Sequence, residues 1–181
     1  MNRPLARVLS PAVLAVAVCL ILVGCGSESG DVVPSSESPA GTTAAVSNDT
    51  AGVTVSGELG SKPTVSIGSQ TKDVTTLVAV DLVEGTGATV AADATITAHY
   101  VGVGAISGQE FDSSWSRGEP TQFPLSGVIE GWSQGIPGMK IGGRRLLVIP
   151  GSMAYGSNPP QGSGIASDEA LVFVVDVVSS P

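Results

Sequence analysis

From Val74 onward the chain is a series of short segments rich in Val, Ile, Leu and Thr, and this pattern limits the fold more than any other feature. The clearest segments are Thr75–Val83, Thr95–Val103, Arg144–Ile149 and Leu171–Val178. Segments of this kind, bounded by Gly, Pro or Asp, predict strands that end in turns. In the second segment the alternation places Ile96, Ala98 and Tyr100 on one face. That face is expected to meet the core, and the more polar opposite face to meet water.

One short helix is predicted around Val128–Ile136, where Pro137 and Gly138 end it. No internal repeat is visible in the sequence. The pattern therefore predicts an α+β fold, in which a twisted antiparallel sheet of about five strands wraps around one short helix.

The aromatic residues confine the main core to the C-terminal half of the chain. The two Trp, two Tyr and three Phe residues all lie between Tyr100 and Phe173. Because large side chains provide most of the buried apolar surface of a small domain, the first half is expected to serve as targeting segment, tether or accessory strand.

The N-terminus has the organisation of an export signal. Arg3 and Arg7 precede an apolar run, Val8–Val23, which is short for a membrane span. The run ends at Leu22-Val23-Gly24-Cys25, which resembles the bacterial lipobox. We therefore expect residues 1–24 to be a lipoprotein signal peptide and Cys25 to carry the lipid; the alternative is an uncleaved anchor with an incidental Cys. Cys19 would leave with the signal, so no disulfide is expected.

Residues 25–49 are rich in Ser, Gly, Thr, Ala and Pro, a composition typical of a flexible tether. In residues 50–73, β-branched alternation over Thr50–Ile67 predicts one or two short strands of an N-terminal extension. The alternative is that this segment is more tether. Residues 74–181 are expected to form the main domain.

Charge and residue types exclude several classes of function. The formal net charge is -8, and removal of Arg3 and Arg7 would make it more negative. Nucleic-acid binding requires a basic surface, so no nucleic-acid partner is expected. His99 is the only histidine, and no Ser-His-Asp arrangement is available. We interpret His99 as an exposed or inter-sheet residue, not as a base or metal ligand, and expect no cofactor or metal.

Five motifs, in order, resemble FKBP-type peptidyl-prolyl cis/trans isomerases. They are Ala98-His99-Tyr100-Val101-Gly102, Phe111-Asp112-Ser113-Ser114, Val128-Ile129-Glu130-Gly131-Trp132, Ala154-Tyr155-Gly156 and Leu171-Val172-Phe173. The resemblance runs from about Thr76 to Ser179 and is specific because the motifs share one order and spacing. The family's fold, a twisted sheet around a short helix, agrees with the fold predicted from the residues.

The resemblance implies an apolar active-site cavity between sheet and helix. It places Trp132 at the floor and the walls at Tyr100, Phe111, Phe123, Val128, Ile129, Tyr155, Ile165 and Phe173. For Ile129, Trp132 and Phe173, burial as ordinary core is an equally natural interpretation.

The resemblance also implies polar roles at the cavity. Asp112 would contact the bound carbonyl region, held by the Tyr100 hydroxyl and by Arg117, and Tyr155 would donate a hydrogen bond to a ligand carbonyl. The alternative for Asp112 is a solvent-exposed salt bridge of little energetic value.

The sequence departs from the family pattern at the rim of the cavity. Thr121 stands where better-known members carry an aromatic residue, the stretch Ser126–Val128 looks shortened, and Ser167-Asp168-Glu169 replaces a frequent Pro-Pro approach to the last strand. These changes bear on substrate preference and macrolide affinity more than on the fold.

We therefore expect a monomeric isomerase that acts on X-Pro segments of exported polypeptides, anchored by the lipid on Cys25 to the extracytoplasmic face of the cell membrane. Macrolides such as tacrolimus or rapamycin are candidate ligands, and the sequence leaves open whether they bind. One alternative is a chaperone or peptide-binding module of the same fold with weak or no isomerase activity. A plain surface-structural lipoprotein is the other alternative.

Overall fold

The computed structural model describes residues 48–181. The predicted signal peptide, the lipidation at Cys25 and most of the predicted tether lie outside the described residues. In the part of the chain that is described, no helix has the length and apolar character that a membrane span requires.

The described chain contains nine strands, one α-helix and four short 3-10 helices. In chain order they are β1 (Asn48–Thr50), β2 (Val53–Ser56), β3 (Thr64–Ile67), η1 (Thr71–Asp73), β4 (Val78–Val83), β5 (Thr95–Gly104), β6 (Glu110–Ser113), η2 (Trp115–Arg117), β7 (Thr121–Pro124), η3 (Leu125–Gly127), α1 (Glu130–Gly135), β8 (Arg144–Ile149), η4 (Gly151–Met153) and β9 (Leu171–Ser179).

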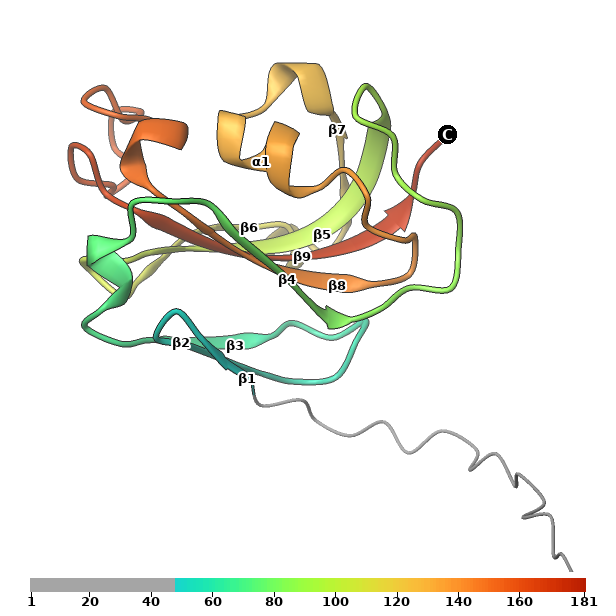
Figure 1. The fold of residues 1–181 in the computed structure, drawn as a ribbon, viewed down its shortest axis with the longest axis horizontal. Helices are drawn as coiled ribbons and strands as arrows, with labels where there is room; N and C mark the ends of the chain where they lie inside the picture. Colours follow the sequence, from blue (N-terminus) through green and yellow to red (C-terminus); the bar gives the residue numbers. More distant parts are fainter. Residues whose placement is uncertain (1–47) are drawn as a thin grey trace, which may run out of the picture. The chain divides into compact units, whose positions relative to one another are not determined.

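The main sheet is antiparallel and is built around the long strand β5 (Figure 1). Its strand order is β4-β8-β9-β5-β6, and β7 also pairs with β5. The first half of β5, Thr95–Ala98, faces β7, whereas Val101–Val103 faces β6. The predicted strands are present as β4, β5, β8 and β9, and β4 begins later than predicted, at Val78. The sheet has six strands where about five were predicted.

Helix α1 is shorter than the predicted Val128–Ile136 because Ile129 keeps an extended backbone, with φ −60° and ψ 153°. Its glycines let it lie close to β8. A Cβ at Gly135 would come within 2.7 Å of Leu147 Cδ2, so a larger residue would push the helix away from the sheet. This close approach places Trp132 against the sheet.

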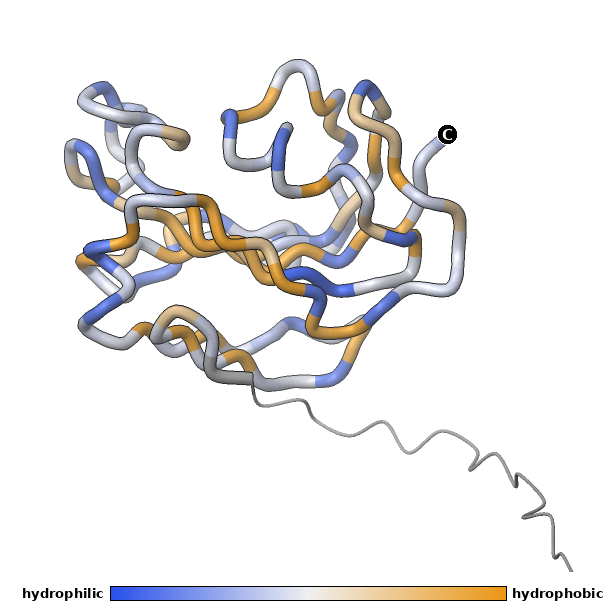
Figure 2. The backbone as a smooth tube through the Cα atoms, in the orientation of Figure 1, coloured by the Kyte–Doolittle hydropathy of each residue, from blue (hydrophilic) through white to orange (hydrophobic). Residues whose placement is uncertain are grey.

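The two faces of the main sheet carry separate apolar clusters. The cluster under α1 contains Trp132, Ile96, Tyr100 and Phe173. The cluster on the opposite face contains Val101, Val103, Leu146, Val148, Val172 and Val174. Figure 2 shows the hydrophobic colouring concentrated along the central strands of the sheet. A sheet that is apolar on both faces needs cover on both faces.

Strands β1, β2 and β3 form a second, three-stranded antiparallel sheet that supplies this cover (Figure 1). In β2, Val53 and Val55 are buried among the residues of the second cluster, and Val65 and Ile67 of β3 pack beside them. Three strands are present where one or two were predicted, and the first begins at Asn48, within the predicted tether. The segment is thus part of the folded core.

A buried ion pair attaches the loop between β2 and β3 to the main sheet. Arg144 Nε donates to Asp176 Oδ1 at 2.6 Å, and Arg144 Nη2 donates to Asp176 Oδ2 at 2.7 Å. The same guanidinium donates to the carbonyl oxygens of Gly57 at 3.1 Å and Ser61 at 2.7 Å. The Gly60 amide donates to Asp176 Oδ2 at 3.3 Å. Both partners of the charge pair are therefore hydrogen-bonded as well as paired, which burial of charge requires.

Candidate active site

Strands β5 and β6 position three of the predicted site residues on the α1 side of the sheet. Tyr100 lies in the middle of β5, and Phe111 and Asp112 lie on the short strand β6 that pairs with it. Gly102 makes room for the aromatic rings, because a Cβ there would come within 2.7 Å of Phe111 and 2.8 Å of Phe173. The close approach of these rings to the strand thus depends on a glycine.

Trp132 is the centre of an aromatic cluster beneath α1. Its ring centroid lies 5.3 Å from that of Phe173, 5.3 Å from that of Phe123 and 5.6 Å from that of Tyr100, each at a steep interplanar angle. Phe111 meets Phe173 edge to face at 5.6 Å. Edge-to-face contacts of this kind hold rings in fixed orientations, so the walls around Trp132 are preorganised.

These rings enclose a cavity of about 290 Å³. It is lined by Tyr100, Phe111, Asp112, Phe123, Gly127, Val128, Ile129, Trp132, Tyr155 and Phe173. Every one of these residues is a predicted site residue except Gly127, which has no side chain to suggest a role.

Two of the selected residues lie beside the cavity and do not line it. Arg117 contacts Tyr100 and Asp112 from η2. Ile165 packs against the partly buried edge of the same core cluster. The structure thus brings the whole predicted set into one region, with these two at its margin.

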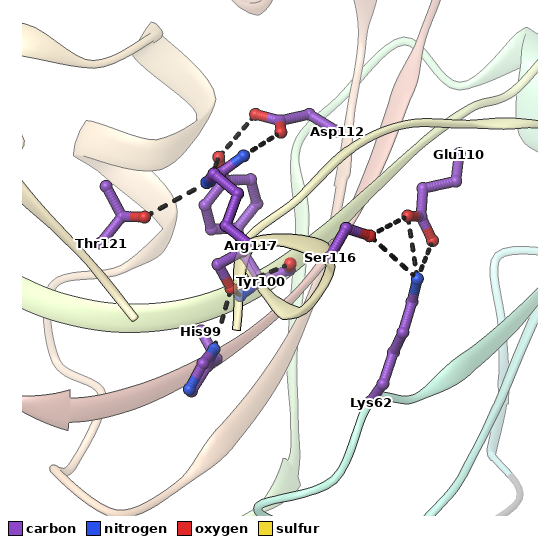
Figure 3. Close-up of polar contacts among 9 residues, drawn as sticks. Lys62, His99, Tyr100, Glu110, Asp112, Ser116, Arg117 and Thr121 are labelled. Carbon is purple, nitrogen blue, oxygen red and sulfur yellow. Dashed lines mark hydrogen bonds and ion pairs between the residues drawn. The ribbon is translucent and has the colours of Figure 1, made fainter. Parts of the chain in front are cut away.

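Tyr100, Asp112 and Arg117 form a closed hydrogen-bonded triangle at one edge of the cavity (Figure 3). The Tyr100 hydroxyl donates to Asp112 Oδ2 at 2.5 Å, and Arg117 Nη1 donates to Asp112 Oδ1 at 2.6 Å. Arg117 Nη2 donates to the Tyr100 oxygen at 2.7 Å and to Thr121 Oγ1 at 3.3 Å. Each polar group of the triangle has a partner, and the orientation of the carboxylate is fixed from two sides.

The surroundings of the cavity lower the pKa of Asp112 and raise the pKa values of Tyr100 and Tyr155. Partial burial pushes the pKa of Asp112 upward, but hydrogen bonds from Tyr100 and Arg117, and the charge of Arg117, outweigh burial and hold that pKa below its usual value. Burial, followed by the hydrogen bond to Asp112, raises the pKa of Tyr100. Burial and the charge of Asp112 raise the pKa of Tyr155. A hydroxyl donor and a carboxylate thus face one apolar cavity at neutral pH.

Comparison with known proteins identifies the fold and the family. Residues 87–178 match the family of FKBP-type peptidyl-prolyl cis-trans isomerases. The chain belongs to this family. It is 51% identical over 105 residues to a probable FK506-binding protein of Corynebacterium glutamicum, across 58% of this chain and 86% of the relative. It is 50% identical over 101 residues to an FK506-binding protein of Streptomyces anulatus, across 55% of this chain and 82% of the relative.

The crystal structure of FkpA from Escherichia coli is similar at a TM-score of 0.53 and 40% identity, over 57% of this chain and 47% of that one. The predicted FKBP-like α+β fold is therefore confirmed. The predicted enzymatic class is confirmed as well, because the matching family is that of FKBP-type peptidyl-prolyl cis-trans isomerases and a relative 44% identical over 84 residues, FkpA of Escherichia coli, carries that name.

On the side of the FKBP sheet away from the cavity, a second set of contacts holds the loop that carries Arg117. Ser114 is buried, and its Oγ accepts a hydrogen bond from the Tyr100 amide at 2.8 Å. His99 Nδ1 lies 3.0 Å from the same oxygen, and the His99 ring stacks on Trp115 with centroids 3.9 Å apart. His99 is half-buried here, beside the loop and not in the cavity.

The FKBP domain also contacts the N-terminal extension near this loop. Lys62 Nζ lies 2.9 Å from Glu110 Oε2 and 3.4 Å from Ser116 Oγ, and Ser116 Oγ donates to Glu110 Oε1 at 3.2 Å (Figure 3). Glu110 begins β6, and Ser116 precedes Arg117 in η2. The sequence pattern does not predict this contact, because its partners are far apart in the chain.

Proposed function

We propose that this isomerase acts on X-Pro bonds of exported polypeptides while held at the extracytoplasmic face of the cell membrane by a lipid on Cys25. The observation that supports catalysis most strongly is the cavity itself, an aromatic pocket with one hydrogen-bonded carboxylate at its edge.

The reaction needs an apolar cavity more than it needs a nucleophile. Rotation about the prolyl bond must break amide resonance, which sets a barrier of about 18–20 kcal/mol. The twisted amide has less charge separation than the planar one, so a site of low polarity favours it relative to the ground state. The proline ring would lie on Trp132, between Phe111, Phe123 and Phe173, with Val128 and Ile129 closing the helix side.

The polar groups would orient the substrate without forming a bond to it. Asp112 lies at the edge of the cavity and, held by Tyr100 and Arg117, would face the carbonyl carbon region of the twisting amide. Tyr155, whose pKa is raised, stays protonated and would donate a hydrogen bond to a substrate carbonyl. No step of this scheme calls for a metal or a nucleotide.

The experiment that tests the isomerase proposal measures cis/trans exchange on Leu-Pro and Phe-Pro peptides with the full chain, by a protease-coupled assay or by NMR. Acceleration that tacrolimus or rapamycin abolishes would support an isomerase that works through this cavity. No acceleration by the folded protein would contradict the proposal. Acceleration that both macrolides leave unchanged would show that these macrolides do not block this cavity.

The second candidate is a peptide-binding or chaperone module of the same fold. The observation that favours it is Thr121, which contributes a hydroxyl accepting from Arg117 where better-known members carry a ring. Suppression of client aggregation without any peptide turnover would support this candidate. Thr121→Phe is then expected to restore turnover.

The proposed location depends on the N-terminal sequence alone, where the charged start, the apolar run and Leu22-Val23-Gly24-Cys25 occur together. Cys25→Ser is expected to abolish incorporation of labelled palmitate in a bacterial host and to release the protein from the membrane fraction. Cys19→Ser is the matched control, which should leave labelling unchanged. Equal labelling of the Cys25→Ser chain and the unaltered chain would contradict the proposal.

A further inference from the structure

Glu169 is a buried carboxylate outside the cavity that the proposed mechanism does not use. It lies just before β9 and is 3% exposed. Its Oε1 accepts hydrogen bonds from the Ile106 amide at 2.8 Å and from the Ser107 amide at 3.4 Å. Its Oε2 accepts from the Ala166 amide at 2.7 Å. One side chain thus binds the backbones of two loops that are about sixty residues apart in the chain.

The carboxylate is satisfied by backbone amides and not by a cation. Among residues 48–181, no Lys or Arg forms an ion pair with Glu169. A buried carboxylate is costly unless hydrogen-bond donors replace the water that it loses. The amides of Ile106, Ser107 and Ala166 supply these donors. Glu169 can therefore hold both loops only while these three amides keep their positions.

The surrounding backbone is shaped to admit this side chain. A Cβ at Gly104 would come within 2.6 Å of Glu169 Oε1, so a glycine leaves the space that the carboxylate fills. Asp168, the preceding residue, has a φ of 57°, in the left-handed region that non-glycine residues seldom adopt. Its amide donates to the Gly156 carbonyl at 2.7 Å. The left-handed turn at Asp168 and its hydrogen bond to Gly156 thus lead the chain into Glu169.

The two loops that Glu169 joins border a small cleft next to the main cavity. Its volume is about 70 Å³, and its lining consists of Gly104, Ser107, Gln109, Glu110, Phe111, Ser163, Gly164 and Ile165. Phe111 lines both this cleft and the main cavity. Ile165 lines the small cleft from the loop that ends at Glu169. Phe111 and Ile165 therefore both line the cleft that the two loops border.

We propose that Glu169 is a positioning residue that fixes the gap between Phe111 and Ile165 and so determines which residues beside the proline the enzyme accepts. This inference rests on the proposed isomerase function. A substrate whose proline occupies the main cavity continues across the rim, and a bulky neighbouring side chain reaches the Phe111–Ile165 edge. An Ala neighbour does not extend that far.

The test compares the full chain with its Glu169→Gln variant on two peptides, Leu-Pro and Ala-Pro. Gln keeps the shape but loses the charge and turns an amide group toward a backbone N–H. We expect kcat/KM for Leu-Pro to fall about tenfold and that for Ala-Pro by less than about twofold, which is the size of effect that a lost contact in a pocket produces. Amide hydrogen exchange at Ile106 and Ala166 should become at least about tenfold faster.

Two further variants complete the test. Gly104→Ala pushes the carboxylate away without removing any donor or acceptor, and it should lower the same Leu-Pro to Ala-Pro ratio. If Glu169→Gln does not fold, Gly104→Ala decides the question. Glu58→Gln removes an exposed carboxylate in the β2–β3 loop and should change neither the ratio nor the exchange rates.

The possible outcomes separate this inference from the proposed function. A changed ratio together with faster exchange at Ile106 and Ala166 supports it. An unchanged ratio, or an equal fall for both peptides, overturns it, since an equal fall indicates a general structural role. Absence of turnover by the unaltered chain overturns the proposed function and this inference together.

Discussion

Asp112 is, among the described residues that line the cavity, the only one that carries a charge. Tyr100 and Arg117 hold it, but its side chain is 42% exposed, so its contribution to the stability of the fold is small. Asp112→Ala is therefore expected to lower kcat/KM on a Leu-Pro peptide roughly tenfold, the size of one lost charge-assisted hydrogen bond, with little loss of stability. The kinetics of cis/trans exchange on the peptide measure the change in kcat/KM, and circular dichroism measures the change in stability. Asp73→Ala, at an exposed site outside the cavity, is the control.

Trp132 is expected to respond differently because it is both cavity floor and core. Trp132→Ala should abolish turnover and also lower the free energy of unfolding by about 3–5 kcal/mol, as large-to-small changes in a core do. Urea unfolding gives the second quantity. Unchanged turnover in both Asp112→Ala and Trp132→Ala would contradict the site assignment.

The lowered pKa of Asp112 gives a pH dependence of defined sign. A carboxyl whose pKa is lower in the folded state stabilises the fold above its ordinary value of 3.8, and this contribution is lost as pH falls through the lowered folded-state pKa. The difference in unfolding free energy between the unaltered chain and Asp112→Asn should thus be constant at neutral pH and shrink only in this acidic range. Urea unfolding across a pH series measures it; a difference that shrank near pH 7 would contradict the assignment.

At the scale of the elements, the Arg144–Asp176 pair joins β8, β9 and the β2–β3 loop. Removing one partner leaves an uncompensated buried charge, so Arg144→Met should cost about 3–5 kcal/mol in urea unfolding. The double variant Arg144→Met with Asp176→Leu should recover much of this. Lys140→Met removes an exposed pair with Glu84 and should cost less than about 1 kcal/mol. Equal losses from Arg144→Met and Lys140→Met would contradict the assigned role.

At the scale of the whole described chain, the three-stranded extension covers an apolar face that the FKBP sheet would otherwise expose. The face includes Val101, Val103, Val148, Val172 and Val174. Deletion of residues 48–73 is expected to expose this surface and cause self-association, because large exposed apolar patches drive it. Light scattering and dye binding measure the effect. A monomeric, soluble deletion variant would contradict the covering role.

The strands of the main sheet differed in how well the sequence predicted them. The segments that became β5, β8 and β9 were predicted because runs of β-branched residues favour strands in any context. Strands β6 and β7 were not predicted individually. They are short and partly polar, and they are strands because each pairs with one half of β5. Their structure thus depends on pairing with β5, which adjoins β6 across a short loop and lies further from β7 in the chain.

The candidate site shows the same distinction between features that the sequence predicts and features that depend on tertiary contacts. The resemblance of the five motifs to FKBP-type isomerases predicted nearly all the residues that line the cavity. The sequence alone thus determined the fold class, the family and most of the cavity. Only the tertiary structure decided the cover by β1–β3, the Arg144–Asp176 attachment and the loops joined by Glu169. Each of these depends on burying a charged or apolar group against a distant segment, and local sequence carries no record of such a partner.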